Sequence, residues 1–368
     1  MKPAPQRSRW SFSIGRIAGI EIRVHGTFLA LLGWILLSHL AAGERVAAAT
    51  RGVLFVVAVF GIVVLHELGH ALTARQFGIR TQDITLLPIG GVARLEKMPE
   101  KPSQELLVAV AGPAVNVALA ALAYAGLRAT GGPLALGAIQ VASGSLLARL
   151  LWVNVALAVF NLLPAFPLDG GRVLRALLAM KMDRVRATDV AARIGQAMAL
   201  LFGMAGLFGS PMLVFVAFFV WIGAAEEDAI VHMTAALERV RVADAMVTRF
   251  ELLEADLSIA EGVERALRAL QRDFPVRQGE RLVGFVSAAE LVRAMSEGAG
   301  DRPISEIATP VDVVVEPAEA VASAMEKLAK SGGGVLPVLQ AGELVGLLVP
   351  ENVAEIAAIN DRVRVRHA

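Results

Sequence analysis

Residues 61–74 read GIVVLHELGHALTA, and this stretch decides how the rest of the chain is interpreted. It lies inside a long apolar run, yet it carries three ionisable side chains within five positions: His66, Glu67 and His70. Ionisable groups at membrane depth are costly and normally face a cavity or a partner. On a helix, residues four apart share one face, so His66 and His70 can bind one metal ion with Glu67 beside it. The stretch therefore predicts a membrane-embedded helix that presents a metal site.

The composition separates the chain into an apolar part and a water-soluble part. The 368 residues are 56% hydrophobic, and the long apolar runs end at about residue 225. The formal net charge is +1 and no basic block is interleaved with aromatic residues, which argues against a nucleic-acid-binding protein. The sequence contains no cysteine, so a metal site has to use His, Asp or Glu. The basic N-terminus lacks a small-residue cleavage pattern, and we interpret it as a cytosolic lead-in.

Apolar segments that approach the length of about 20 residues needed to cross a bilayer occur six times. They are Thr27–Ala42, Val53–Phe77, Leu106–Leu127, Ser145–Leu163, Ile194–Gly209 and Met212–Ala224. Basic residues concentrate in the loops 78–102 and 169–190 and are scarce in 43–50 and 129–140. The positive-inside rule then places the N-terminus and the C-terminal part in the cytosol. Residues 81–96, which are interrupted by a proline and two glycines, predict a β-hairpin next to the membrane.

A hydrolytic metal site needs a third protein ligand, and Asp169 is the best candidate. It lies in NLLPAFPLDGGR, at the end of the fourth predicted span, which runs in the same direction as the span that carries the two histidines. A loop residue or a helix cap is the alternative for Asp169. Residues that oppose regular helix surround it, and irregular backbone at membrane depth is tolerated only where it is buried in protein or lines a wet cavity. These residues are Pro164, Pro167, Gly170 and Gly171.

Four motifs in a fixed order carry a family resemblance. They are HELGH at 66–70, LLPIGGVA at 86–93, AGPAVN at 111–116 and NLLPAFPLDGG at 161–171. With these motifs the chain resembles the site-2 protease family of intramembrane zinc metalloproteases, over most of its first 225 residues. HExxH alone is a weak signal, but the combination of the four motifs is specific.

The resemblance implies a set of residue roles. One Zn²⁺ per chain is expected on His66, His70 and Asp169, with Glu67 as the general base that takes a proton from the attacking water. Chemistry alone leaves Asn161 open between hydrogen bonding to an oxyanion and bonding to another helix. The resemblance raises Asn161 to a substrate or oxyanion contact.

The same resemblance bears on two other motifs. The hairpin around Gly90 and Gly91 is expected to hold the unwound substrate as an added strand, because a helix hides its peptide bonds. In AGPAVN the small residues suit tight helix packing, and we interpret Asn116 as a hydrogen-bonding contact between helices. Asn154 is interpreted in the same way.

The water-soluble tail contains an internal repeat over 242–296 and 304–360, in which each copy has an apolar-Pro-Val strand, a polar turn, a second strand and a helix. The repeat resembles a pair of cystathionine-β-synthase-type (CBS) domains, an α/β module that often binds adenine nucleotides and dimerises. Ser287 and Glu290 are a near match to the ribose-contact pattern, with Glu in place of Asp. ATP or AMP binding is one hypothesis for this pair, and a structural or dimerising role is the other.

The sequence thus predicts a multi-pass α-helical membrane protein with a soluble α/β tail. The expected domains are a transmembrane zinc protease domain at 1–225, a linker helix at 226–241 and the CBS pair at 242–360. The expected function is hydrolysis of peptide bonds in or near the transmembrane segment of membrane-anchored proteins, in a bacterial inner membrane. A transporter or channel with a CBS tail is the alternative, but an ion path would spread polar groups along the bilayer depth. A catalytically dead relative would be expected to lack Glu67, which is present.

Overall fold

Two compact units make up the chain, one over Gln6–Ile230 and one over Val231–Ala368. A computed structural model describes residues 10–43, 45–88, 90–96, 98–99, 101–130, 145–269, 271–331 and 334–353. Most of the predicted loop 129–140 and the end of the second repeat, 354–360, fall outside these ranges.

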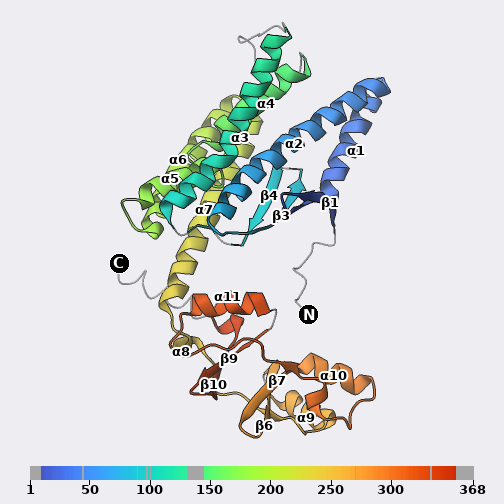
Figure 1. Cartoon of the computed structure of the whole chain (residues 1–368), viewed down its shortest axis with the longest axis vertical. Helices are drawn as coiled ribbons and strands as arrows, with labels where there is room; N and C mark the ends of the chain where they lie inside the picture. The colour runs from blue at the N-terminus through green and yellow to red at the C-terminus, as the bar shows by residue number, and fades with distance from the viewer. Residues whose placement is uncertain are drawn as a thin grey trace. The chain divides into compact units, whose positions relative to one another are not determined.

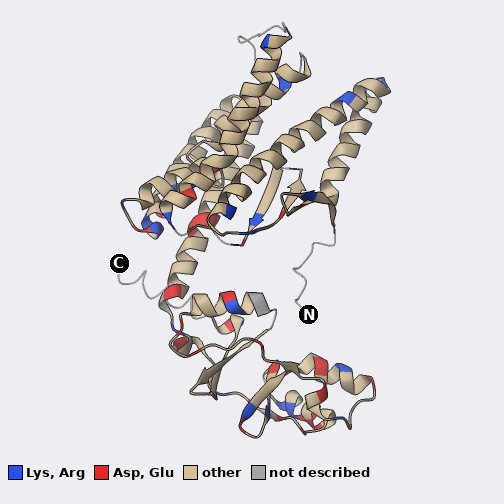
Figure 2. Ribbon diagram, viewed as in Figure 1, with Lys and Arg blue, Asp and Glu red and all other residues tan. Residues whose placement is uncertain are grey.

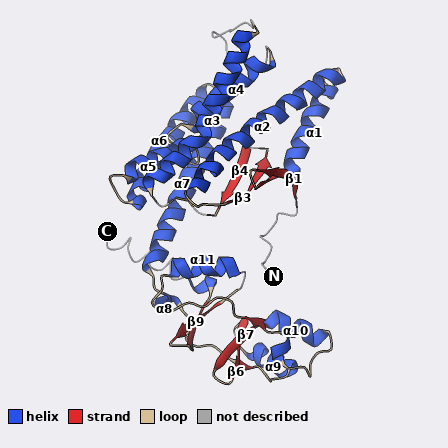
Figure 3. Ribbon diagram, viewed as in Figure 1, coloured by secondary structure: helices blue, strands red, loops and turns tan. Residues whose placement is uncertain are grey.

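The first unit is a set of helices with one small sheet at one end (Figures 1 and 3). Its helix α3 is central, because it packs against α2, α4 and α5. The helices have the following bounds: α1 Gly26–Ala41, α2 Val46–Gln76, α3 Pro102–Ala129, α4 Leu146–Asn161, α5 Asp169–Ala179, α6 Arg184–Phe208 and α7 Pro211–Arg239. The last of them runs without a break from the predicted sixth span into the predicted linker, and so joins the two units.

Within the part of the chain that the structure describes, the length and the polarity of three of these helices suit a bilayer. Among the described residues, α2, α3 and α6 are long and apolar enough to cross a membrane, while α1 and α4 are apolar but have only 16 residues each. Figure 2 shows that these apolar helices are mostly uncharged along their lengths, with Lys, Arg, Asp and Glu gathered toward their ends. The predicted number of six spans stays a prediction.

The sheet of the first unit has the strand order β1-β2-β3-β4. Its strands are β1 Ser11–Ile17, β2 Ile20–His25, β3 Thr81–Leu87 and β4 Gly90–Leu95. β3 and β4 pair antiparallel around the predicted turn, whereas β2 pairs parallel with β3 from before α1. Apolar side chains such as Ile22 and Ile84 on the sheet pack against Phe60 and Leu68 of α2, which fixes the sheet against the helix that carries the HELGH motif. The two N-terminal strands were not predicted.

The segment that leads to Asp169 corrects one expectation. Residues 162–168 are irregular, as predicted, but Asp169 begins the regular helix α5, so the prediction of irregular backbone beyond that residue is wrong. Glycine permits this tight start. A Cβ at Gly170 would lie 2.2 Å from the carbonyl oxygen of Leu163, and one at Gly171 would lie 2.6 Å from the backbone nitrogen of Phe166. The glycines therefore let the first turn of α5 pack directly on the preceding loop.

The second unit contains two small cores, each built on an antiparallel strand pair. The pair β6 Asp273–Gln278 with β7 Arg281–Ser287 is extended by β5 Leu253–Glu254 and β8 Thr309–Pro310, and the other pair is β9 Leu336–Gln340 with β10 Glu343–Leu348. The helices and turns are α8 Val242–Ala245, α9 Ile259–Arg268, α10 Ala288–Ser296, α11 Val321–Ser331 and the 3₁₀ turn η1 Ile304–Glu306. Both predicted repeats thus have the strand pair expected of them.

The two repeats exchange their leading segments. Val242 and Ala245, at the start of the first copy, are buried in the core of the second, and Val247 bridges to Leu347. Ile304, at the start of the second copy, is buried in the core of the first. Because each copy completes the core of the other, neither core is closed by one repeat alone.

Candidate metal centre

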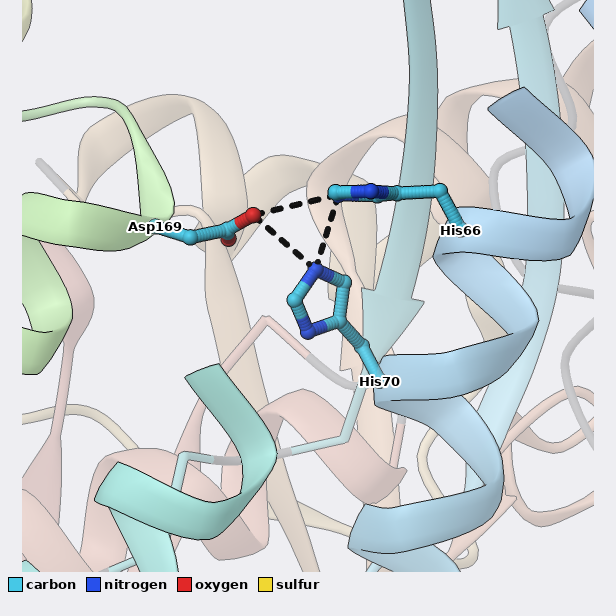
Figure 4. Close-up of side chains that lie close together, drawn as sticks. All are labelled: His66, His70 and Asp169. Carbon is cyan, nitrogen blue, oxygen red and sulfur yellow. Dashed lines mark hydrogen bonds and ion pairs between the residues drawn. The ribbon is translucent and has the colours of Figure 1, made fainter. Parts of the chain in front are cut away.

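Three ligand-type side chains from two distant segments converge at one point (Figure 4). The Nε2 atoms of His66 and His70 lie 3.1 Å apart, and the Oδ2 atom of Asp169 lies 3.1 Å from the first and 3.2 Å from the second. All three residues are buried. The predicted i,i+4 face of α2 and the first turn of α5 therefore meet at the same depth.

Hydrogen bonds on the far side of each imidazole fix its tautomer. His70 Nδ1 donates to the backbone carbonyl of Val108 at 2.7 Å, and a carbonyl can only accept. His66 Nδ1 donates to Oδ1 of Asn116 at 2.5 Å. With the proton on Nδ1, each neutral ring presents an unprotonated Nε2 to the point of convergence. Two nitrogen lone pairs and a carboxylate then face one another. A cation bound between them would remove the electrostatic repulsion among these groups.

Asn116, which the sequence analysis interprets only as a hydrogen-bonding contact between helices, also bonds to one of the candidate ligands. Its Nδ2 donates to Oδ1 of Asn154, and Nδ2 of Asn154 donates to the carbonyl of Leu150, both within the helix bundle. This chain of bonds leaves Oδ1 of Asn116 facing His66, so it orients the ligand as well as joining helices. Such an orienting partner is a regular feature of metal-binding histidines.

Gly112 lies directly against the Nε2 atoms of His66 and His70. A Cβ at this position would come within 2.2 Å of Nε2 of His70 and 2.6 Å of Nε2 of His66. A glycine is therefore required where α3 passes the site. The AGPAVN motif supplies this glycine together with Asn116, and the i,i+4 spacing of the two residues puts both on one face of α3.

A cavity of about 830 Å³ opens onto this centre. Its lining contains every residue predicted for the catalytic site: His66, Glu67, His70, Gly90, Gly91, Asn161 and Asp169. Gly91 brings β4 against α2, because a Cβ there would lie 3.0 Å from Cγ of Glu67. Arg172, three residues after Asp169, also lines the cavity and was not singled out from the sequence.

The donor set fits zinc. Zinc takes imidazole nitrogen and carboxylate oxygen at about 2.0–2.2 Å, and ligand atoms in a tetrahedral arrangement are then about 3.3 Å apart. The observed separations of 3.1–3.2 Å agree with one ion bound by three ligands. Three protein ligands leave the fourth position open, as catalytic zinc sites do.

Comparison with known proteins places the chain in a family. The model of peptidase family M50 matches residues 54–145 and 127–202. Zinc metalloprotease MJ0392 of Methanocaldococcus jannaschii is 33% identical over 288 residues, which cover 77% of this chain and 79% of the relative. The chain belongs to peptidase family M50. Rip3 of Mycobacterium tuberculosis, also named as a zinc metalloprotease, is 31% identical to this M50 chain over 375 residues, covering 95% of it and 93% of the relative.

Solved structures are also similar to the M50 chain. A site-2 protease from Methanocaldococcus jannaschii is 35% identical with a TM-score of 0.44, covering 60% of this chain and 95% of that one. CBSX2 in complex with AMP is 25% identical with a TM-score of 0.30, covering 33% of this chain and 98% of that one. The family assignment confirms the prediction of a zinc metalloprotease of the site-2 type over the transporter alternative, and it makes the M50 chain an integral membrane enzyme.

In the second unit the candidate nucleotide residues are engaged with each other. Ser287 is the N-cap of α10, and its Oγ accepts from the backbone N–H of Glu290 at 3.2 Å. Glu290 accepts in return from the backbone N–H of Ser287 at 2.9 Å and from its hydroxyl at 2.8 Å. These bonds form a complete capping box, which explains both residues without a ligand.

The surroundings of this capping box are acidic. Burial raises the pKa of Asp273, which pairs with Ser287 across the strand ladder, and the negative charges of Glu290 and Glu351 raise it further. Arg272 opposes this effect. An environment of carboxylates suits the hydroxyl groups of a ribose better than it suits phosphates.

Proposed function

We propose that His66, His70 and Asp169 bind one Zn²⁺ and that Glu67 is the general base of an intramembrane endopeptidase. The observation that carries the proposal is the convergence of three acceptor atoms within 3.2 Å of one another. Both imidazoles are held in the tautomer that carries its proton on Nδ1 and leaves Nε2 free to bind a metal. Zinc, when bound, supplies Lewis acidity and makes water nucleophilic at neutral pH.

The roles of the chain's own residues follow from their places around the cavity. Glu67 follows His66 on α2 and lines the cavity, so its carboxylate can accept the proton of the attacking water and return it to the leaving amine. Asn161, at the end of α4, can donate its amide N–H to the peptide oxygen as negative charge develops there. Removal of a single donor of this kind costs about 10²–10³ in kcat.

The substrate is proposed to be a membrane-anchored protein cut in or near its transmembrane segment. Support comes from β4, which is an edge strand of its sheet and lines the cavity along its whole length, Gly90–Leu95. An unwound peptide that pairs with this edge would run past Glu67, and backbone hydrogen bonds would hold it there without regard to most side chains. Gly91 leaves no side chain between the strand and Glu67.

For the membrane, we propose six spans in a bacterial inner membrane with a membrane-associated hairpin at β3–β4. The N-terminus and the second unit are then cytoplasmic, as the basic residues of the loops indicate. The membrane part, the linker helix and the tail correspond to residues 1–225, 226–241 and 242–360 in this proposal.

The second unit is proposed to be a CBS pair that modulates the protease, with ATP or AMP at Ser287 and Glu290 and with dimerisation as a further role. The paired repeats and their exchanged segments support the domain type. The closed capping box counts against ribose binding unless a nucleotide opens it. Equilibrium dialysis of the full chain with labelled ATP and AMP tests this part, and a lack of retention of either nucleotide contradicts it.

The test of the catalytic proposal uses wild type and Glu67→Gln purified in detergent. Zinc per chain is measured together with cleavage of a single-span test substrate. Wild type is expected to hold about one zinc and to cut, whereas Glu67→Gln is expected to keep its zinc and lose about 10²–10⁴ in rate. A Glu67→Gln enzyme that cuts at the wild-type rate would remove Glu67 from the mechanism.

A further inference from the structure

A fully buried arginine lies outside the cavity. Arg175 of α5 has no exposed surface, and its Nε donates to Oε1 of Glu105 on α3 at 2.8 Å. Its Nη1 donates to Glu227 on α7. Glu105 is itself only 1% exposed. Three helices of the first unit thus meet at one buried guanidinium, that of Arg175.

Two further contacts surround this group. Arg184 of α6 lies 3.7 Å from Oε2 of Glu105 and donates to the carbonyl of Pro99. The guanidinium of Arg175 also lies 5.1 Å from the ring centre of Phe166, which is fully buried in the loop that leads to Asp169. Arg175 therefore contacts the loop before Asp169 as well as α3 and α7.

Stability alone is a poor explanation for such a group. Burying an ion pair costs desolvation that its attraction barely recovers, and apolar replacements of similar volume are often as stable. What a buried arginine provides is geometry, because its planar fork fixes the direction of two partners at once. The question is which geometry the three helices have to keep.

The position of Arg175 relative to the metal centre answers this question. It lies six residues after Asp169 on α5, and Glu105 lies three residues before Val108 on α3. The carbonyl of Val108 orients His70, and Asn116 on the same helix orients His66. The Arg175–Glu105 pair thus ties the helix that orients both histidines to the helix that begins with the third ligand.

We propose that Arg175, through Glu105, is a positioning residue for the metal centre, which sets the separation of α3 and α5 and so the size of the ligand triangle. The inference rests on the proposed zinc site. Glu227 attaches α7 to the same guanidinium. The second unit begins at Val231, and α7 continues beyond this residue to Arg239. This helix is therefore the covalent connection through which the second unit can act on α5.

Two variants keep the test independent of folding. Arg175→Lys keeps the positive charge but loses the fork, and the triple variant Glu105→Gln/Arg175→Met/Glu227→Gln removes the guanidinium together with both carboxylates that it contacts. Arg186→Gln is the matched control, since Arg186 pairs with Asp183 on the surface with its side chain 80% exposed. The readouts are zinc affinity by chelator competition, the thermal midpoint of the zinc-free protein and the visible spectrum after cobalt substitution.

The proposal expects zinc affinity about 10- to 100-fold weaker in both variants, as for other residues that support metal ligands. It also expects an altered cobalt spectrum and a zinc-free thermal midpoint close to that of wild type. Wild-type affinity and spectrum in a folded variant would overturn it, as would a zinc loss fully matched by loss of the zinc-free fold in Arg175→Lys. Wild type and Arg186→Gln that both fail to bind zinc would instead overturn the proposed zinc site, and the inference with it.

Discussion

The candidate metal centre of the first unit and the capping box of the second unit both consist of polar side chains in motif spacing, but their partners differ. His66 and His70 hydrogen-bond to groups 50 and 38 residues away, and these bonds turn their free atoms toward one point. Ser287 and Glu290 bond each other three residues apart, and both are turned back onto the start of their own helix. The long-range partners bring side chains from separate helices to one point, as a ligand site requires, whereas the local partners complete the cap of a single helix.

The largest effect is expected from a substitution at Gly112, which lies against the Nε2 atoms of His66 and His70. Gly112→Ala would place a Cβ 2.2 Å from Nε2 of His70, so the rings have to move and zinc affinity should fall by at least about 100-fold. The loss cannot come from helix propensity, since alanine favours a helix by about 1 kcal/mol over glycine. Zinc per chain after dialysis is the measurement.

The control for that substitution lies on the same helix. At Gly126 a Cβ would meet only Leu147, at 3.6 Å, which is an ordinary contact. Gly126→Ala should keep the zinc content of wild type. Full zinc retention by Gly112→Ala would mean that the nitrogens do not converge as described.

A smaller effect is expected when only the orienting bond is removed. Asn116→Ala leaves all three ligands in place but frees the His66 ring, so zinc affinity should fall by about 10- to 100-fold. Asn116→Asp keeps an acceptor for Nδ1 and should lose less, although it gives up the bond to Asn154. Competition with a chelator measures both, and equal affinity in wild type and Asn116→Ala would contradict the role of Asn116.

In the second unit the corresponding substitution should act locally. Ser287→Ala removes the N-cap of α10 and should destabilise that helix by about 1 kcal/mol, seen as faster amide hydrogen exchange in the full chain. Ser296→Ala, at the other end of α10, is the control. If Ser287→Ala instead left exchange unchanged but weakened ATP or AMP binding, the contrast between the two sites would disappear.

The smallest effect concerns the acidic surroundings of the capping box. A carboxyl whose pKa is raised in the folded state favours folding when protonated, so the benefit is complete below its unfolded pKa and is lost as pH rises through the folded one. Asp273→Asn should therefore raise the thermal midpoint of the second unit at pH 7, by an amount that shrinks as the pH falls toward about 4. Calorimetry of the full chain at several pH values checks this, and a difference that grows on acidification would contradict it.

Local spacing explains what the sequence could predict. The i,i+4 pair of His66 and His70 is set by helix geometry alone, and Asp169 followed from the need for a third ligand at the same depth. The strand pair at β3–β4 followed from a proline and two glycines between apolar runs. The helix and hairpin inferences need only a few neighbouring residues, whereas the choice of Asp169 used the order and direction of the predicted spans.

The rest depended on contacts that no local pattern contains. Asn116 meets His66 across 50 residues, and its role could not be told from helix packing by spacing. The start of α5 at Asp169 depends on the close approach of Gly170 to Leu163, which only the packed loop reveals. The similarity of the two repeats in sequence also does not show that the leading segment of each copy packs in the core of the other. The alternation of Phe12 and Ile14 with polar residues is a sequence signal for the strand β1. It lies within the basic segment that the sequence analysis interprets as a cytosolic lead-in.

The most direct test of the central claim is zinc X-ray absorption on the full chain, for wild type and for Asp169→Ala. Wild type is expected to show two imidazole nitrogens at about 2.0–2.1 Å and light oxygen ligands at about 2.0–2.2 Å, and Asp169→Ala is expected to lose bound zinc or one oxygen ligand. A wild-type spectrum without two imidazoles, or identical spectra and zinc content in the two proteins, would contradict a centre formed by His66, His70 and Asp169.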